Sequence, residues 1–349
     1  MNTKLLCTLG PASLNKNIIS KLEELGTTLF RLNLSHTSID DLSELIDFVQ
    51  KNTNIPLSLD TEGAQIRNGK IVNGSIELFE NETIEIVKDV ILGNKKEFNL
   101  YPSFIFDEIE LGNLISIDFN SLLVKVIKKT SDRITVKVIN GGVMGQNKAV
   151  TINKTISLPP LTSKDIKAID IGRKFGIKNY ALSFANTAQD VDFIRKKTGK
   201  NSIIISKIEC INGIKNLKNI INKSNAILID RGDLSREIPI EYVPSFQNKI
   251  IEKANKLKKH VYVATNLLES MTSRSRPTCA EVNDVFNTLA SGANGLVLAA
   301  ETAIGLNPIN SAKMIVKLVN VYEKDNERNS VLYSNQPLSK LLEKITFDE

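Results

Sequence analysis

Three charged side chains lie just beyond two short apolar segments of the sequence. Lys207 and Glu209 follow the segment 202–206, and Asp233 comes soon after the segment 226–229. A lysine and two carboxylates at the ends of neighbouring buried strands are costly unless they meet a ligand. Two carboxylates can hold Mg²⁺ or Mn²⁺, and a lysine can stabilise negative charge that develops beside them. We predict a metal-assisted reaction on an anionic substrate, with a structural ion pair as the alternative.

Other polar residues follow further apolar segments. Arg31 and Arg67 are fixed cations suited to phosphate or carboxylate. Gly232 begins a turn whose backbone N–H groups suit an anion, and the hydroxyl of Thr265 suits proton relay, with helix capping as its alternative. A further group of neutral and singly charged oxygens suits a monovalent cation, and it comprises Asn33, Ser35, Asp60 and Thr61. The alternative for these four residues is a role in turns and helix caps.

Apolar segments of β type alternate with amphipathic segments of helical period along most of the chain. The predicted strands are Lys4–Leu9, Thr28–Leu32, Leu57–Leu59, Tyr180–Ser183, Ile203–Ser206, Ala226–Ile229, Val261–Ala264 and Gly295–Leu298. The predicted helices include Asn17–Leu25, Asp40–Lys51, Ala188–Thr198, Tyr242–Lys258 and Ala280–Ser291, the last with a capping box from Thr278 to Glu281. Eight βα units predict an α/β fold, a (β/α)8 TIM barrel whose site lies at the carboxyl ends of the strands.

The period changes to two between about residues 66 and 152. Segments such as 82–87 and 133–138 alternate apolar and polar residues, and turns such as Asn73-Gly74 separate them. We predict a small all-β domain inserted after the third barrel strand. The expected organisation is a first barrel part at 1–65, the inserted β-rich domain at 66–152, a second barrel part at 153–327 and a polar tail at 328–349.

The composition excludes several classes of partner. The chain has 349 residues, 42% of them hydrophobic, which suffices for a large core. The net charge of +6 comes from dispersed lysines and Trp is absent, so we expect no nucleic acid. Neither a signal peptide nor a long apolar run is present, so we expect no membrane span and a cytoplasmic protein. Cys7, Cys210 and Cys279 lack metal-like spacing, which suits a reducing compartment.

A series of motifs, in this order, resembles the pyruvate kinase family over nearly the whole chain. The matching stretches are Cys7-Thr-Leu-Gly-Pro-Ala-Ser, Arg31-Leu-Asn-Leu-Ser-His, Leu59-Asp-Thr-x-Gly-x-x-Ile-Arg, Ser206-Lys-Ile-Glu, Asp230-Arg-Gly-Asp-Leu, Ala264-Thr-x-x-Leu-Glu-Ser-Met, Arg276-Pro-Thr-x-Ala-Glu-Val and Glu301-Thr-Ala-x-Gly. The resemblance implies glycolytic phosphoryl transfer from phosphoenolpyruvate to ADP, giving pyruvate and ATP. It also implies Mg²⁺ (or Mn²⁺), K⁺ as a further candidate, and a mobile lid formed by the inserted domain.

The resemblance assigns roles to single residues. Lys207 would stabilise the phosphoryl group and the enolate, Glu209 and Asp233 would hold the divalent metal, and Arg31 would contact phosphate. Thr265 would lie near the enolate during its protonation. The remaining expectations are substrate contacts at Gly232, Asp233 and Thr265; K⁺ contacts at Asn33, Ser35, Asp60 and Thr61; and nucleotide contacts at Arg67, His36, Pro11 and Lys148, with ordinary surface roles as the alternative for His36 and Lys148.

The sequence departs from the family pattern mainly on the nucleotide side. Gln65 stands where the family usually has a glutamate linked to K⁺ dependence, and Ile304 stands where it usually has a lysine. Asp230 replaces a small residue. The family's usual C-terminal domain does not follow the barrel, so we expect none of the usual effector regulation and a homodimer, if any, through the barrel.

Two other functions stay open. A metal-dependent lyase or aldolase that uses phosphoenolpyruvate or the enolate of pyruvate, with an acceptor other than a nucleotide, needs the same residues. It predicts enolisation of pyruvate without a nucleotide. A catalytically weak paralogue that only binds predicts neither turnover nor metal-dependent binding. The combination of Lys207, Glu209, Asp233 and Thr265 argues against it, because a scaffold has no need for buried unpaired charges.

Overall fold

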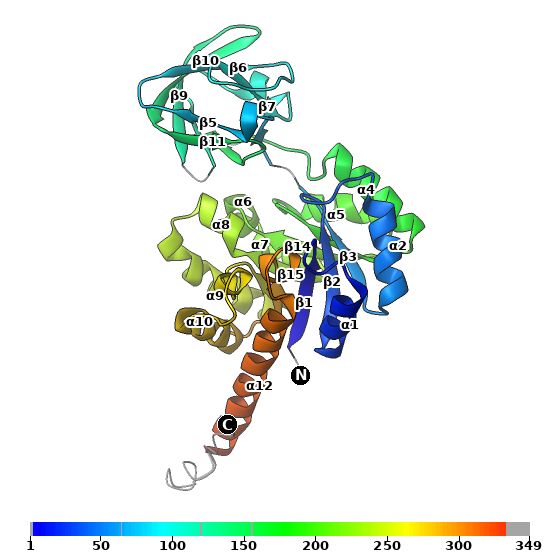
Figure 1. Ribbon diagram of the computed structural model, residues 1–349. Helices are drawn as coiled ribbons and strands as arrows, with labels where there is room; N and C mark the ends of the chain where they lie inside the picture. The colour runs from blue at the N-terminus through cyan, green and yellow to red at the C-terminus, as the bar shows by residue number, and fades with distance from the viewer. Residues whose placement is uncertain (1–2, 64, 119–120, 155, 333–349) are drawn as a thin grey trace. The chain divides into compact units, whose positions relative to one another are not determined.

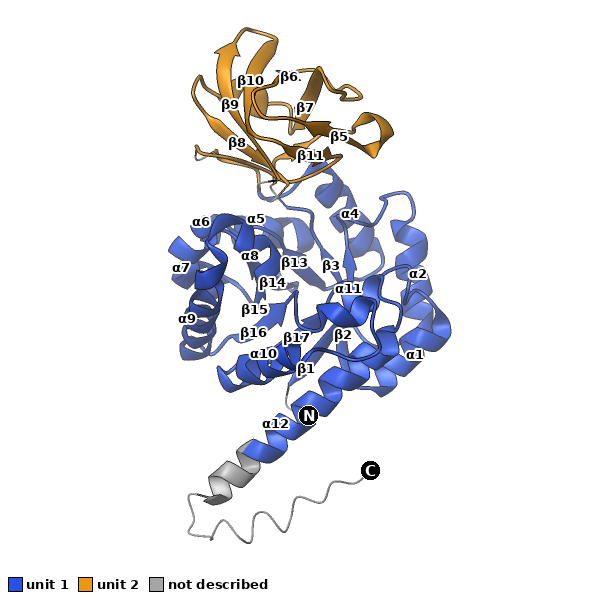
Figure 2. Ribbon diagram, turned by 60° about the vertical axis from the view of Figure 1, so that its left-hand side comes forward, with its two compact units in different colours: residues 1–63, 160–349 blue, residues 64–159 orange. Residues whose placement is uncertain are grey.

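The protein, seen in a computed structural model, forms two compact units. The structure describes residues 3–63, 65–118, 121–154 and 156–332, with the backbone alone at 326–332. The barrel unit comprises residues 1–63 and 160–349, and the β unit comprises residues 64–159 (Figure 2). The sequence predicts borders of the β unit at 66 and 152. The β unit extends beyond 152 because Ile156 and Leu158 pack against its core.

Eight parallel strands close into a barrel in the order β1-β17-β16-β15-β14-β13-β3-β2 (Figure 1). Their bounds are β1 Lys4–Leu9, β2 Thr27–Asn33, β3 Leu57–Asp60, β13 Asn179–Leu182, β14 Ile203–Ile208, β15 Ala226–Asp230, β16 His260–Ala264 and β17 Gly295–Leu298. The pairing of β1 with β17, in register at Lys4 and Gly295, closes the ring. The predicted α/β barrel is therefore confirmed, and each predicted strand end lies within two residues of the observed one.

The helices follow the strands along the chain and surround the barrel (Figure 1). Their bounds are α1 Lys16–Glu24, α2 Leu42–Asn52, α4 Ser163–Lys174, α5 Ala188–Thr198, α6 Ile211–Lys215, α7 Leu217–Lys223, α8 Arg231–Glu237, α9 Val243–Lys256, α10 Cys279–Ala290, α11 Ala300–Ala303 and α12 Pro308–Leu332, with 3₁₀ turns η2 Ile240–Tyr242 and η3 Glu269–Thr272. The capping box predicted before α10 is confirmed, since Thr278 and Glu281 bond to each other's backbone N–H. None of the helices within the described ranges is long and apolar enough to cross a bilayer.

The last helix runs past one predicted border. The sequence predicts a polar tail from residue 328, but α12 continues to Leu332. No glycine or proline interrupts residues 328–332, so the backbone has no local reason to leave the helix there. The rest of the predicted tail lies outside the described residues.

The barrel strands are apolar on both faces. Successive side chains point to opposite faces, so Leu5 and Cys7 pack toward the helices while Leu6 packs inside the barrel. Tyr262 fills part of the interior, and a Cβ at Gly295 would lie 2.4 Å from its ring. With both faces filled, polar side chains of these strands concentrate at the strand ends.

The β unit is built around its own apolar core. It contains a seven-stranded sheet in the order β12-β8-β9-β10-β6-β7-β4 and a two-stranded sheet of β11 and β5. The bounds are β4 Arg67–Asn68, η1 Val72–Gly74, β5 Ser75–Leu78, β6 Thr83–Val87, β7 Glu97–Tyr101, α3 Ile105–Glu108, β8 Leu114–Ile117, β9 Leu122–Lys129, β10 Arg133–Asn140, β11 Gly142–Gly145 and β12 Val150–Ile152. The segments predicted from period two at 82–87 and 133–138 form β6 and β10, which pair antiparallel. Their apolar positions, such as Ile84 and Val136, face the core.

Candidate functional site

Five polar residues meet at the carboxyl ends of neighbouring barrel strands. Asp60 ends β3, Ser183 follows β13, Lys207 lies in β14, Glu209 follows that strand, and Asp230 ends β15. All five are buried. Because the strands are parallel, their carboxyl ends share one rim of the barrel, and side chains distant in sequence become neighbours there.

The ammonium group of Lys207 lies at the centre of this group. Its Nζ is 3.1 Å from Ser183 Oγ, and the Lys207 residue is 5% exposed. The nearest carboxylate oxygens lie 3.2 Å away on Glu209, 3.4 Å away on Asp230 and 3.6 Å away on Asp60. Burial lowers the pKa of Lys207, but these three carboxylates outweigh burial and raise the pKa above its usual value. Lys207 is therefore a permanent cation at neutral pH.

Glu209 has one satisfied and one open oxygen. Its Oε1 accepts a hydrogen bond of 2.7 Å from the backbone N–H of Phe184. Its Oε2, although close to Lys207, accepts no hydrogen bond from any described residue. Burial raises the pKa of Glu209 well above its usual value, and the nearby carboxylates of Asp233, Asp230 and Asp60 add to this although Lys207 opposes it. This oxygen has the ammonium of Lys207 beside it at 3.2 Å and can still accept a proton or contact a further cation.

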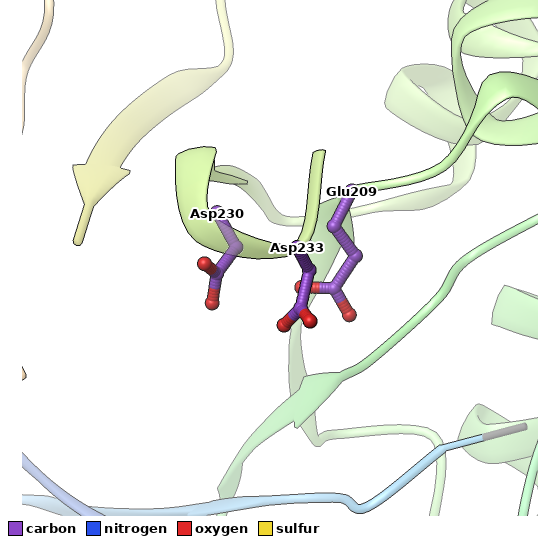
Figure 3. A group of neighbouring side chains, drawn as sticks. All are labelled: Glu209, Asp230 and Asp233. Atoms are coloured by element: carbon purple, nitrogen blue, oxygen red, sulfur yellow. The ribbon is translucent and has the colours of Figure 1, made fainter. Parts of the chain in front are cut away.

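Glu209, Asp230 and Asp233 form a three-carboxylate cluster. Each offers one oxygen, and these oxygens all lie within 4.8 Å of one another. Figure 3 shows the three carboxylates on the same side of the ribbon that carries them. Asp233 is half-buried in the first turn of α8 and pairs with Arg236 Nη1 at 2.9 Å. A set of carboxylate oxygens with one open buried atom fits a hard divalent cation such as Mg²⁺ or Mn²⁺.

Asp230 is a member of this cluster that sequence reasoning did not place in the site. Its Oδ1 accepts a hydrogen bond of 3.2 Å from the hydroxyl of Thr265. Burial raises the pKa of Asp230, but the cations Lys207 and Arg31 outweigh burial and lower it. The signal available in the sequence was an acidic residue directly after the apolar segment 226–229.

Thr265 takes a conformation that is rare for a β-branched residue. It follows β16 with φ +67°, and such left-handed backbone is strained for threonine. Its carbonyl accepts hydrogen bonds of 3.0 and 2.6 Å from Nε and Nη2 of Arg231, whose Nη1 also pairs with Asp284. Its Oγ1 accepts a hydrogen bond of 2.8 Å from Gly232 N–H, so this donor is engaged within the loop. Arg231 and Asp284 were not predicted as site residues.

The four residues predicted for a monovalent cation lie at the ends of β2 and β3. Asn33 and Asp60 are partners across this strand pair. Asn33 Oδ1 accepts a hydrogen bond of 3.0 Å from Ser35 N–H, and Thr61 Oγ1 accepts one of 3.0 Å from the N–H of Ser183.

Arg31, predicted as a phosphate contact, lies beside this group. It is 4% exposed, and its Nη1 pairs with Asp60 Oδ2 at 3.0 Å. Its Nε donates to Thr8 Oγ1 at 2.9 Å. These two bonds fix the guanidinium plane against the barrel wall.

The residues predicted to contact a nucleotide are divided between the two units. Pro11 and His36 are exposed on the barrel unit. Arg67 and Lys148 lie in the β unit, where Arg67 Nη1 donates to the carbonyl of Asn147 at 2.9 Å. Lys148 Nζ pairs with Asp118 Oδ2 at 3.1 Å. Each unit therefore carries two of the four predicted contacts.

Comparison with known proteins gives consistent matches. A family model described as pyruvate kinase, barrel domain, matches residues 1–312. The chain is 34% identical over 342 residues to a pyruvate kinase of Sporosarcina psychrophila. This alignment covers 95% of this chain and 58% of the relative. It is 33% identical over 333 residues to a pyruvate kinase of Thermotoga maritima, covering 93% of this chain and 71% of the relative. It is 34% identical over 328 residues to plastidial pyruvate kinase 3 of Arabidopsis thaliana, in an alignment that covers 90% of this chain and 56% of the relative. The chain thus spans little more than half the length of most of these relatives.

Proposed function

The chain belongs to the pyruvate kinase family, and from this premise we propose that it transfers the phosphoryl group of phosphoenolpyruvate to ADP, giving pyruvate and ATP. One observation carries the proposal: the buried ammonium of Lys207 lies among carboxylates at the barrel rim, beside the open oxygen Glu209 Oε2. Such an arrangement suits a substrate that carries an anionic phosphoryl group and yields an enolate.

The divalent cation of this proposal is Mg²⁺ or Mn²⁺, and Glu209 and Asp233 would hold it. The support is the spacing of their oxygens, the burial of Glu209 and its open Oε2. When bound, the cation supplies positive charge to the phosphoryl oxygens and to the oxygen of the leaving enolate.

The protein's own groups act on each stage of the proposed reaction. The bond between phosphorus and the enol oxygen breaks, that oxygen keeps the electron pair, and a β-phosphate oxygen of ADP forms the new bond to phosphorus. Lys207 stabilises the charge that grows on the enolate oxygen and the phosphoryl group, and Arg31 contacts the phosphate. The enolate carbon then takes a proton, at a position that Thr265 borders. Substrate contacts are proposed at Gly232, Asp233 and Thr265.

The remaining assignments are proposals of the same kind. Arg67 would contact a nucleotide phosphate, and Pro11, His36 and Lys148 are proposed as further nucleotide contacts. K⁺ would contact Asn33, Ser35, Asp60 and Thr61. The support for the K⁺ assignment is the adjacency of Asn33 and Asp60 on paired strands. We further propose a cytoplasmic protein and, for any homodimer, contact through the barrel.

One observation favours a second candidate function. Ile304 is 67% exposed at the position where the family resemblance places a lysine on the nucleotide side. An exposed apolar side chain there offers no attraction to a nucleotide phosphate. A lyase or aldolase that forms the same enolate with another acceptor is therefore the alternative, and it predicts enolisation of pyruvate with metal alone.

³¹P NMR of the purified protein with phosphoenolpyruvate, Mg²⁺ and ADP, with and without K⁺, tests the proposal. We expect the phosphoenolpyruvate signal to disappear as the signals of ATP grow. Phosphoenolpyruvate that stays intact in every mixture contradicts the kinase proposal. Exchange of the methyl protons of pyruvate for deuterium, with metal and no nucleotide, would then support the enolate alternative.

A further inference from the structure

The buried charges around Lys207 do not balance. Lys207 and Arg31 bring two positive charges, whereas Asp60, Glu209 and Asp230 bring three negative charges. Asp233, at the edge of this group, is paired with Arg236. Buried carboxylates in excess over cations are costly unless they are protonated or bind a metal. Asp230 is the carboxylate that sequence reasoning did not expect here, and without it the two signs would balance.

The orientation of Asp230 resembles that of Glu209. Each carboxylate has one oxygen near a protein donor. Glu209 Oε1 accepts from the N–H of Phe184, and Asp230 Oδ1 lies 3.2 Å from the hydroxyl of Thr265, whose proton is shared with the carbonyl of Ala264 at 2.5 Å. The other oxygen of each lies close to Lys207 Nζ, at 3.2 Å for Glu209 and 3.4 Å for Asp230. Carboxylates that bind metals are commonly fixed in this way, with one oxygen hydrogen-bonded and the other offered to the ion.

A role of Asp230 as a mere ion-pair partner of Lys207 does not account for this arrangement. The ammonium already lies close to Asp60, Glu209 and the hydroxyl of Ser183. One lysine has three N–H groups, and those three neighbours already occupy them, so Asp230 is left without a lysine N–H of its own. The oxygens of Asp230, Glu209 and Asp233 also lie within 4.8 Å of one another, which is the spacing a single ion can bridge.

We propose that Asp230 is a third carboxylate ligand of the divalent cation, together with Glu209 and Asp233. The inference rests on the metal site of the proposed function but not on the kinase reaction itself. Three carboxylates bind a divalent cation more tightly than two, so the free protein holds Mn²⁺ without substrate. Thr265 and its support Arg231 then act as positioning residues for a metal ligand, since the hydroxyl of Thr265 fixes Asp230.

Mn²⁺ titration of the protein without substrate, followed by electron paramagnetic resonance of the free ion, tests the inference. Asp230→Asn keeps an acceptor for Thr265 but removes the charge, and we expect it to weaken Mn²⁺ binding at least by the roughly tenfold that loss of an outer partner already costs. Asp192→Asn is the matched control, because it removes one carboxylate charge from a surface pair with Lys223. The control should bind Mn²⁺ as the wild type does. Unchanged affinity in Asp230→Asn overturns the proposal.

A second variant separates ligation from simple electrostatics. Asp230→Cys in a Cys279→Ser background places a thiolate in the cluster and removes the exposed cysteine. Both remaining cysteines, Cys7 and Cys210, are buried and are also present in Cys279→Ser alone, so that variant controls for any signal that they give. We expect Cd²⁺ to produce a thiolate charge-transfer absorption in Asp230→Cys that Cys279→Ser alone lacks. Absence of this absorption in folded protein overturns ligation by Asp230.

Mn²⁺ binding by Glu209→Gln distinguishes a failure of the third-ligand proposal from a failure of the whole metal site. Loss of Mn²⁺ binding in Glu209→Gln but not in Asp230→Asn removes only the third ligand. Unchanged Mn²⁺ binding in both variants removes the metal site, and with it the proposed function's use of Glu209. Near-ultraviolet circular dichroism of each variant checks that the fold is retained.

Discussion

Two parts of the barrel rim differ in how their polar groups are satisfied. At the ends of β2 and β3, Asn33, Asp60 and Thr61 accept hydrogen bonds from neighbouring residues, and Arg31 pairs with Asp60. At the ends of β14 and β15, Glu209 Oε2 is ion-paired with Lys207 but accepts no hydrogen bond from any residue that the structure describes. The two parts therefore differ in the satisfaction of their buried acceptors, and not in polarity alone.

The difference arises from the backbone as much as from residue type. The loop after β2 turns so that Ser35 N–H meets the Asn33 side chain, which supplies a donor locally. After β14 the single N–H of Phe184 reaches Glu209, and it binds only one of the two oxygens. The predictions that follow test whether the carboxylate side is a ligand site and whether the β2–β3 side is mainly structural.

The largest effect is expected from Lys207→Met. We expect phosphoryl transfer to fall by roughly 10²–10³ or more, because the charge that grows on the enolate loses its nearest cation. The carboxylates of Asp60, Glu209 and Asp230 also lose their shared partner. Removal of one member of a buried ion pair costs about 3–5 kcal/mol of stability. A coupled assay and urea unfolding measure the two effects. Turnover retained at the wild-type rate would remove Lys207 from the mechanism.

The next effect concerns pH. Because burial raises the pKa of Glu209, its carboxyl group holds a proton at a pH where an exposed glutamate does not. A metal must displace that proton, so Mn²⁺ affinity should fall about tenfold for each pH unit below the raised pKa. Isothermal titration calorimetry in buffers of different ionisation enthalpy measures the proton released. Binding that is independent of pH would contradict the raised pKa.

The raised pKa of Glu209 also determines whether the stability of the metal-free protein rises or falls with pH. A raised pKa in the folded state means that Glu209 contributes stability below its unfolded pKa of about 4.3, and that this contribution is lost as pH rises through the folded value. Glu209→Gln is the control, because it cannot titrate. Thermal unfolding of the metal-free protein across pH should lose this slope in the variant.

A smaller effect is expected from Arg231→Lys. The lysine cannot reproduce the guanidinium bonds to the carbonyl of Thr265 and to Asp284, which should cost about 1–2 kcal/mol of stability. We also expect lower kcat, because Thr265 loses the support for its left-handed backbone. Arg195→Lys is the matched control, since Arg195 binds the carbonyls of Ser202 and Lys223 away from the site. Equal kcat in the two variants would limit Arg231 to a structural role.

The smallest effect is expected from Asn33→Ala. Loss of the hydrogen bond from Ser35 N–H should cost about 0.5–1.5 kcal/mol, as for other local turn bonds. Asn15→Ala, which removes a similar bond to Asn17 N–H, is the control for that cost. The dependence of activity on K⁺ then distinguishes a cation site at Asn33 from a purely structural turn. A shifted K⁺ requirement in Asn33→Ala but not in Asn15→Ala supports a cation site, whereas no shift leaves Asn33 as a turn residue.

Much of the site could be predicted from sequence because it depends on local pattern. The positions of Lys207 and Glu209 beside an apolar strand follow from hydrophobic periodicity, and the capping box at Thr278 follows from its Thr-x-x-Glu motif. Asp230 could not be placed as a partner of Glu209, because their proximity depends on the pairing of β14 with β15. Arg231 was missed for the same reason, since its partners Thr265 and Asp284 are far along the chain.

The sequence by itself determined which segments become strands and helices, and it determined that polar residues follow the barrel strands. These features depend on side-chain period, on caps and on the burial of apolar residues, which act over a few residues. Only the tertiary structure decided that Asp230 lies beside the carboxylates of Glu209 and Asp233, and that Glu209 Oε2 accepts no hydrogen bond within the described part of the chain. It also decided the left-handed backbone of Thr265. These features depend on which strand ends become neighbours when the barrel closes, and no local preference encodes the balance of donors and acceptors there.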